Sequence, residues 1–181
     1  MNIRKFVFVS CVVVLVVGCA PMLEVNEDFD EATDFSNYQT YDLMPRGDVA
    51  MTAEAEAKFA GRRQVMEEEL RKALKKHLEA KGITRVTDNP DLLIAYFVGV
   101  RNEVFMSNYG MHYADYTGNV IIQSVQDGTL RIDFVDPKTE RLVWRGSAYG
   151  AVNRDPTEDM IRKNIDRAVK KTLDQYPPKK K

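Results

Sequence analysis

Cysteine, histidine and tryptophan are scarce in this 181-residue chain, which holds two cysteines, two histidines and one tryptophan. Both cysteines, Cys11 and Cys19, lie near the N-terminus, so the rest of the chain has no disulfide framework and no cysteine-ligated zinc site. The chain also lacks an excess of one charge, because it has 26 basic and 27 acidic residues. This balance argues against a nucleic-acid-binding protein, which would need a strongly basic face. The sequence lacks a G-x-S-x-G elbow, a P-loop and a dinucleotide fingerprint, and therefore carries no catalytic signature.

The first 19 residues have the layout of a secretory leader. Arg4 and Lys5 precede an apolar stretch, Phe6–Val17, and Gly18 and Cys19 follow it. The stretch is shorter than the roughly 20 residues that a membrane-spanning helix needs. A retained membrane anchor or a buried strand is the alternative interpretation. With Leu15 before it, the Val16–Cys19 segment looks like a bacterial lipobox, which predicts cleavage between Gly18 and Cys19 and lipid attachment to Cys19.

Such processing would leave a protein held to a membrane by acyl chains, typically a diacylglycerol and an amide-linked chain such as palmitate. Ala20 follows the lipidated position and favours the outer membrane, because an aspartate there favours inner-membrane retention in enteric bacteria. We expect a signal peptide over 1–18, a lipidated tether over 19–21, one domain over 22–178 and a basic tail over 179–181. Loss of Arg4 and Lys5 changes the net charge from −1 to −3.

Hydrophobic periodicity predicts an α+β fold. Apolar residues at helical spacing predict one helix over roughly Ala53–Lys81, and a second helix that opens with Asp155 as its N-cap. Strands are expected at Met22–Phe29, Tyr38–Met44, Ile83–Val86, Leu92–Val100, Val120–Val125, Thr129–Val135 and Arg141–Val152, and Asn102–Asn119 is expected to be irregular. The simplest packing is a two-layer sandwich, with both helices on one face of a mostly antiparallel sheet.

Seven motifs in this order and spacing resemble a family of short bacterial envelope lipoproteins known as domain of unknown function 4136. They are Asp28–Asp30 with Ala32–Tyr38 and Thr40–Tyr41, Ala80–Gly82, Pro90–Tyr96, Gly128–Leu130 with Ile132–Asp133, Asp136–Pro137, Leu142–Gly146, and Tyr176–Pro178. Glu140 departs from the pattern, because relatives often have glycine after this hairpin turn. The resemblance implies a lipoprotein with an α+β fold, and it implies no catalytic residue because the family has no agreed activity.

One loop gathers residue types that often form binding sites. Tyr109, His112, Tyr113 and Tyr116 could line a pocket or contact a partner, and the alternative is a loop whose aromatic rings cover a sheet edge. The other histidine, His77, falls beside the apolar stripe of the first predicted helix and is expected to have a structural role.

Two further features of the predicted hairpin are expected to be structural. Trp144 is expected in the core or on a hairpin face. Arg131, Arg141 and Arg145 could form a basic stripe, but a solvated sheet face that discourages edge pairing is the favoured interpretation.

These observations predict a non-enzymatic binding module on the periplasmic face of the outer membrane. The membrane and an envelope protein are the expected partners, with no cofactor, no metal and no nucleic acid. The alternative is a small-molecule or lipid-binding domain whose site is lined by the aromatic loop at 105–116, and an enzyme such as a hydrolase is a third possibility. The sequence leaves the oligomeric state open.

Overall fold

The computed structural model describes residues 23–45, 53–100, 103–107, 128–151, 153 and 155–179, with the backbone alone for 53–60, 100 and 103–107. The strands are β1 (Leu23–Phe29), β2 (Thr40–Leu43), β3 (Thr84–Arg85), β4 (Leu92–Val100), β5 (Glu103–Ser107), β6 (Thr129–Asp136) and β7 (Arg141–Gly150). The helices are α1 (Ala53–Glu79) and α2 (Glu158–Leu173), and a short 3₁₀ helix spans Phe35–Asn37.

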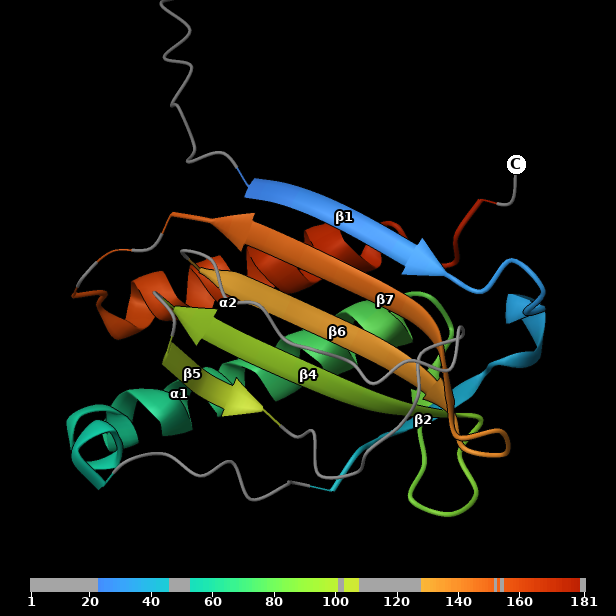
Figure 1. The fold of residues 1–181 in the computed structure, drawn as a ribbon, viewed down its shortest axis with the longest axis horizontal. Coiled ribbons are helices and arrows are strands. Elements are labelled where there is room, and N and C mark those ends of the chain that lie inside the picture. The colour runs from blue at the N-terminus through green and yellow to red at the C-terminus, as the bar shows by residue number, and fades with distance from the viewer. Residues whose placement is uncertain are drawn as a thin grey trace, which may run out of the picture.

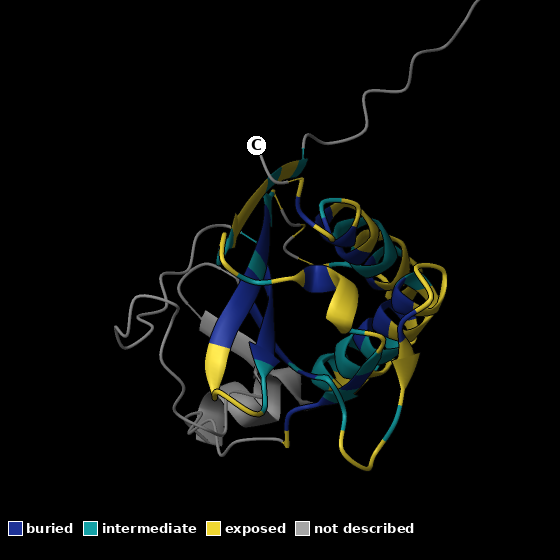
Figure 2. Cartoon of the chain, turned by 90° about the vertical axis from the view of Figure 1, so that its right-hand side faces the viewer, coloured by how far each residue is buried: buried dark blue, intermediate teal, exposed yellow. Residues whose placement is uncertain are grey.

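The strands form one open, mixed sheet in the order β1-β7-β6-β4-β2-β3 (Figure 1). β1, β7, β6 and β4 pair antiparallel, while β2 runs parallel to both β4 and β3. β5 pairs antiparallel with the second half of β4, beyond the residues that pair with β2. Both helices lie on the same face of the sheet (Figure 2). The predicted α+β fold, with a mostly antiparallel sheet and two helices on one face, is confirmed.

Several predicted elements have close to their expected bounds. β4 spans the predicted residues, and its apolar run is explained by its place inside the sheet, with neighbours on both sides. The β6–β7 hairpin is confirmed, although β7 ends at Gly150 rather than Val152. The prediction of an irregular Asn102–Asn119 segment is wrong at its start, because β5 lies there. The strand predicted at Val120–Val125 lies outside the described residues.

Helix α1 ends in the left-handed turn that its glycine predicts. Gly82 has a φ of 80°, its N–H donates to the Glu79 carbonyl, and the Ile83 N–H donates to the Leu78 carbonyl. This pair of bonds is a Schellman motif, in which glycine takes the left-handed position without a steric cost. Leu78 and Ile83 are both buried, so the same turn also brings the end of the helix onto the core.

Helix α2 begins later than predicted. The expectation that Asp155 caps it is wrong, because the N-cap is Thr157, whose hydroxyl accepts a hydrogen bond from the Met160 N–H at 3.3 Å. Asp155 instead forms an ion pair with Arg62 of α1. The first helical residues are Glu158 and Asp159, whose charges favour the positive end of the helix dipole.

The main core lies between the helices and the sheet. Leu70 and Leu74 of α1 and Val169 of α2 are fully buried there, and Ile165 is half-buried against the same cluster. Aromatic rings fill one end of this layer. The Phe134 ring lies 4.8 Å from Trp144 and 4.7 Å from Tyr176, measured between ring centroids. The expectation that Trp144 belongs to the core is confirmed.

Candidate functional site on the sheet face opposite the helices

The residues predicted to carry function lie outside the described part of the chain. These are Gly18 and Cys19 of the predicted cleavage and lipidation site, and Tyr109, His112, Tyr113 and Tyr116 of the aromatic loop. Their roles remain predictions, and the described residues supply a different candidate.

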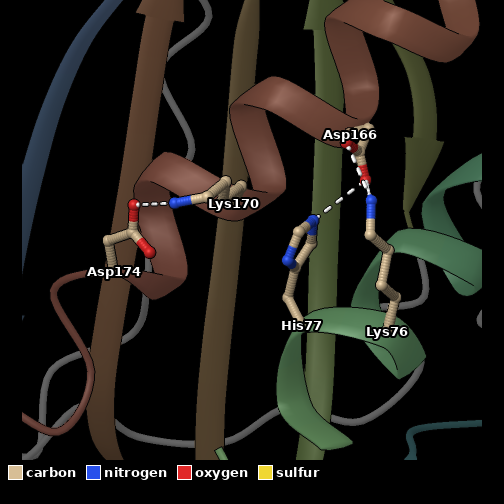
Figure 3. A network of polar contacts seen from close by, with 5 residues as sticks. All are labelled: Lys76, His77, Asp166, Lys170 and Asp174. Carbon is tan, nitrogen blue, oxygen red and sulfur yellow. Dashed lines mark hydrogen bonds and ion pairs between the residues drawn. The ribbon is translucent and has the colours of Figure 1, made fainter. Parts of the chain in front are cut away.

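His77 has the structural role expected of it. Its Nε2 atom lies 2.9 Å from the Asp166 carboxylate on α2, and its side chain is 12% exposed (Figure 3). Lys76 binds the same carboxylate at 2.9 Å. The hydrogen bond from Lys76, followed by that from His77, holds the pKa of Asp166 below its usual range. This cluster joins α1 to α2 and points to no ligand.

The sheet face that points away from the helices carries buried polar groups. Asp133 of β6 is fully buried and lies opposite Arg145 of β7 in the strand register. The Arg145 Nε donates to Asp133 Oδ1 at 2.8 Å, and its Nη2 pairs with Oδ2 of the same carboxylate. Two parallel hydrogen bonds of this kind give the most specific geometry that an arginine and a carboxylate can form.

Arg131 lies two residues before Asp133 on β6, and its side chain lies on the same face. Arg131 is 6% exposed, and its register neighbours are Phe97 of β4 and Ser147 of β7. Its Nε and Nη1 atoms are buried, and neither has a hydrogen-bond partner among the residues that the structure describes. The expectation that Arg131 and Arg145 belong to a solvated face is therefore wrong, while Arg141, at the start of β7, is exposed as expected.

Two sequence patterns together indicate that the sheet face with Arg131 and Asp133 is buried. The alternation of Thr129–Val135 correctly places Leu130, Ile132 and Phe134 toward the helices, and hence Arg131 and Asp133 on the other side. Alternation alone does not tell whether the second face is covered. The neighbouring strand does, because β4 is apolar throughout, and a strand that is apolar on both faces belongs to a sheet that is buried on both.

This polar face suits the binding of an oxyanion better than acid–base chemistry. Both carboxylate oxygens of Asp133 are engaged by Arg145, so Asp133 is not placed as a free general base. An arginine guanidinium carries up to five N–H donors and matches carboxylate and phosphate oxygens. Within the described part of the chain, no group of three histidine, cysteine, aspartate or glutamate residues is placed to hold a metal ion.

A family model described as "Domain of unknown function (DUF4136)" matches residues 25–178. The chain is a member of the DUF4136 family. The match begins at the third residue of β1 and continues past α2, so this DUF4136 domain includes both helices and all the described strands except Leu23 and Glu24. A comparison with curated proteins finds no match.

The solved structures that match this DUF4136 protein share little of its sequence. One is a PDZ domain protein from Parabacteroides distasonis, at 17% identity and a TM-score of 0.48. The alignment covers 88% of this chain but 37% of that one, so the DUF4136 chain spans well under half of its length. Another is PelC from Paraburkholderia phytofirmans, a dodecamer, at 12% identity and a TM-score of 0.46, with 84% of this chain and 95% of that chain covered.

The two helices of this DUF4136 protein differ from membrane-spanning segments. Among its described residues, neither α1 nor α2 combines the length and the apolar character that a membrane span needs.

Proposed function

We propose that this protein is a lipoprotein of the outer membrane, held on the periplasmic face by acyl chains on Cys19, and that it acts as a non-enzymatic binding module. The leader supports the anchor, because Arg4, Lys5, the short apolar stretch and Gly18–Cys19 stand in the order of a lipoprotein signal. Ala20 supports the outer-membrane location.

The observation that carries this proposal is the position of the first strand. β1 begins at Leu23, which pairs with Gly150 at the edge of the sheet. Three residues, Ala20 to Met22, therefore separate the predicted lipidation site from the folded domain. At about 3.5 Å per extended residue, the domain would lie roughly 10–15 Å from the lipid surface. A module held so close is suited to partners in or on the same membrane.

Support for a binding role comes from the buried polar face. Arg131 presents guanidinium donors in a covered position, and Ser147 places a hydroxyl next to it across the β6–β7 pair. Such donors bind and orient oxygen-bearing groups without forming or breaking a covalent bond.

The anchor is tested with three variants of the full-length protein expressed in a bacterial host and labelled with an acyl-chain probe. Cys19→Ser should stay uncleaved, take up no label and leave the outer-membrane fraction. Cys11→Ser is the matched control, because Cys11 belongs to the leader and its loss should change neither processing nor labelling. Ala20→Asp should shift the lipidated protein toward the inner membrane.

Normal cleavage and labelling of Cys19→Ser would overturn the anchor. The binding role is tested separately, by crosslinking the lipidated protein in cells and identifying the envelope component that is captured. Recovery of the protein alone at every crosslinker length would contradict a binding role.

A further inference from the structure

We propose that Arg131 is the centre of a binding site for a singly charged oxyanion, a carboxylate or a phosphodiester, on the sheet face opposite the helices. This inference rests on the proposed binding role and names the chemistry of its ligand. It is built from β4, β6 and β7 alone, and it does not require the lipid anchor.

The first argument is the charge of Arg131. A guanidinium stays protonated at all physiological pH values, so it cannot escape burial by losing its proton. Burial of an unpaired charge is costly unless an opposite charge or several acceptors replace the lost water. Arg131 is 6% exposed, and its Nε and Nη1 have no acceptor among the described residues. An oxyanion would supply the acceptors that this side chain lacks.

The second argument is the β4 side of Arg131, where its described neighbours are apolar. Its neighbour on β4 is Phe97, which is fully buried, and the flanking β4 residues on that face are Ala95 and Gly99. A hydrogen bond to a charged group is stronger beside such apolar walls than in water. On the β7 side, the Ser147 hydroxyl can donate a further hydrogen bond to the same oxyanion.

The third argument concerns the charge that the ligand should carry. The nearby carboxylate, Asp133, is already held by Arg145 through two contacts. Arg131, Arg145 and Asp133 together therefore carry one net positive charge. One negative charge on the ligand balances this cluster. The second negative charge of a dianion would be repelled by the Asp133 carboxylate. Asp28 of β1 faces Arg145 in the strand register, and Glu24 lies on the same face. Both are exposed, so water and salt screen their charges, and both stand two strands away from Arg131.

The test uses the protein as it is recovered from the cells that express it, in detergent, with thermal unfolding followed by tryptophan fluorescence. Trp144 is the chain's one tryptophan, it is fully buried, and it lies on the opposite face of the sheet. Sodium acetate, sodium dimethyl phosphate and sodium chloride are titrated at equal ionic strength. We expect acetate or dimethyl phosphate to raise Tm by about 3 °C or more above the chloride curve. The anion that acts at the lower concentration identifies a carboxylate or a phosphodiester source.

The variant Arg131→Met keeps an unbranched apolar stem and removes the donors. It should lose the anion-dependent rise in Tm and bind the effective anion about tenfold or more weakly. Arg141→Met is the matched control, because this arginine belongs to the same hairpin but is exposed, and it should respond as the unchanged protein does. Equal curves in all three salts, or an undiminished response of Arg131→Met, would overturn the site.

A second measurement keeps the test decisive if Arg131→Met does not fold. In the unchanged protein labelled with ¹⁵N, the Arg131 Nε–H resonance should shift during titration with the effective anion and stay unchanged with chloride. Absence of that shift would also overturn the site. Neither result bears on acyl labelling of Cys19, so failure of the oxyanion site and failure of the anchor are distinguishable.

Discussion

At the scale of single residues, Gly146 of β7 lies in close contact with Thr172 of α2. A Cβ atom built at this position would lie 2.3 Å from Trp144 Cη2 and 2.4 Å from Thr172 Cγ2. Neither neighbour can move easily, because both side chains are fully buried. We expect Gly146→Ala to lower the free energy of unfolding by about 1–3 kcal/mol through overpacking, measured by urea unfolding with Trp144 fluorescence.

Gly61 provides the matched control for that substitution. It lies on an exposed turn of α1, and a Cβ atom there would meet nothing within 4 Å. Gly61→Ala should raise the free energy of unfolding by about 0.5–1 kcal/mol, because alanine loses less backbone entropy in a helix. Equal effects of the two substitutions would show that helix and sheet are not in close contact at Gly146.

Asp91 joins the starts of β2 and β4. Its Oδ2 atom accepts hydrogen bonds from the Thr40 hydroxyl at 2.7 Å and from the backbone N–H groups of Gln39 and Thr40. The Thr40 hydroxyl, and then these N–H groups, hold the pKa of Asp91 below its usual range. The stabilisation is therefore complete above the unfolded-state pKa of about 3.9 and is lost as the pH falls through the lower folded-state pKa.

The prediction for Asp91 follows from that pH dependence. Asp91→Ala should lower the free energy of unfolding by about 1–2 kcal/mol at pH 7, and the difference from the unchanged protein should shrink below about pH 4. Urea unfolding at a series of pH values checks it. A difference that is constant from pH 7 to pH 2 would contradict a role for the ionised carboxylate.

At the scale of elements, residues 155–158 offer two candidate N-caps for α2, Asp155 and Thr157. Thr157 caps the helix, whereas the sequence pattern pointed to Asp155. Thr157→Ala should cost about 1 kcal/mol of stability. Asp155→Ala should cost less than about 0.5 kcal/mol, because the ion pair with Arg62 is formed by exposed side chains. Thermal unfolding of both variants checks the order, and the reverse order would restore Asp155 as the cap.

The elements also show which parts of the fold can be predicted from local sequence patterns. The position of β4 was predictable because nine apolar or small residues in a row have few alternatives to a central strand. β5 was missed, because a five-residue strand among asparagine, glycine and tyrosine has no periodicity of its own and is fixed by pairing with β4. The α2 cap was misplaced because Asp155 and Thr157 are both good caps, and the surrounding packing decides between them.

The candidate site was predictable only in part, for a related reason. The hairpin sequence placed Arg131 and Asp133 on one face, and the structure confirms this placement. The pairing of Asp133 with Arg145 depends on the register between β6 and β7, which a bulge after Phe134 shifts. Glu140, with a φ of 53°, takes a left-handed backbone conformation near the turn. The register therefore depends on a strained residue that local propensity would not select.

At the scale of the whole molecule, the position of β1 decides how near to a membrane the proposed lipid anchor would hold the domain. If β1 is paired as described, about every second amide of residues 23–29 should be protected from hydrogen exchange by its bond to β7. Hydrogen exchange of the mature protein, read residue by residue, checks this. Rapid exchange throughout residues 23–29 would lengthen the free tether and remove the argument for a membrane-proximal domain.

The pairing of β1 with β7 also determines the order in which the chain can fold. Residues 23–29 meet residues 144–150, so the first strand to leave a ribosome or a secretion pore finds its neighbour after more than a hundred further residues have emerged. Until then β1 is an extended segment with an open edge, the kind of segment that aggregates with other chains. Glu24, Glu27 and Asp28 give it three negative charges and no positive one. Mutual repulsion between such segments would keep newly made chains apart during the interval before the sheet closes.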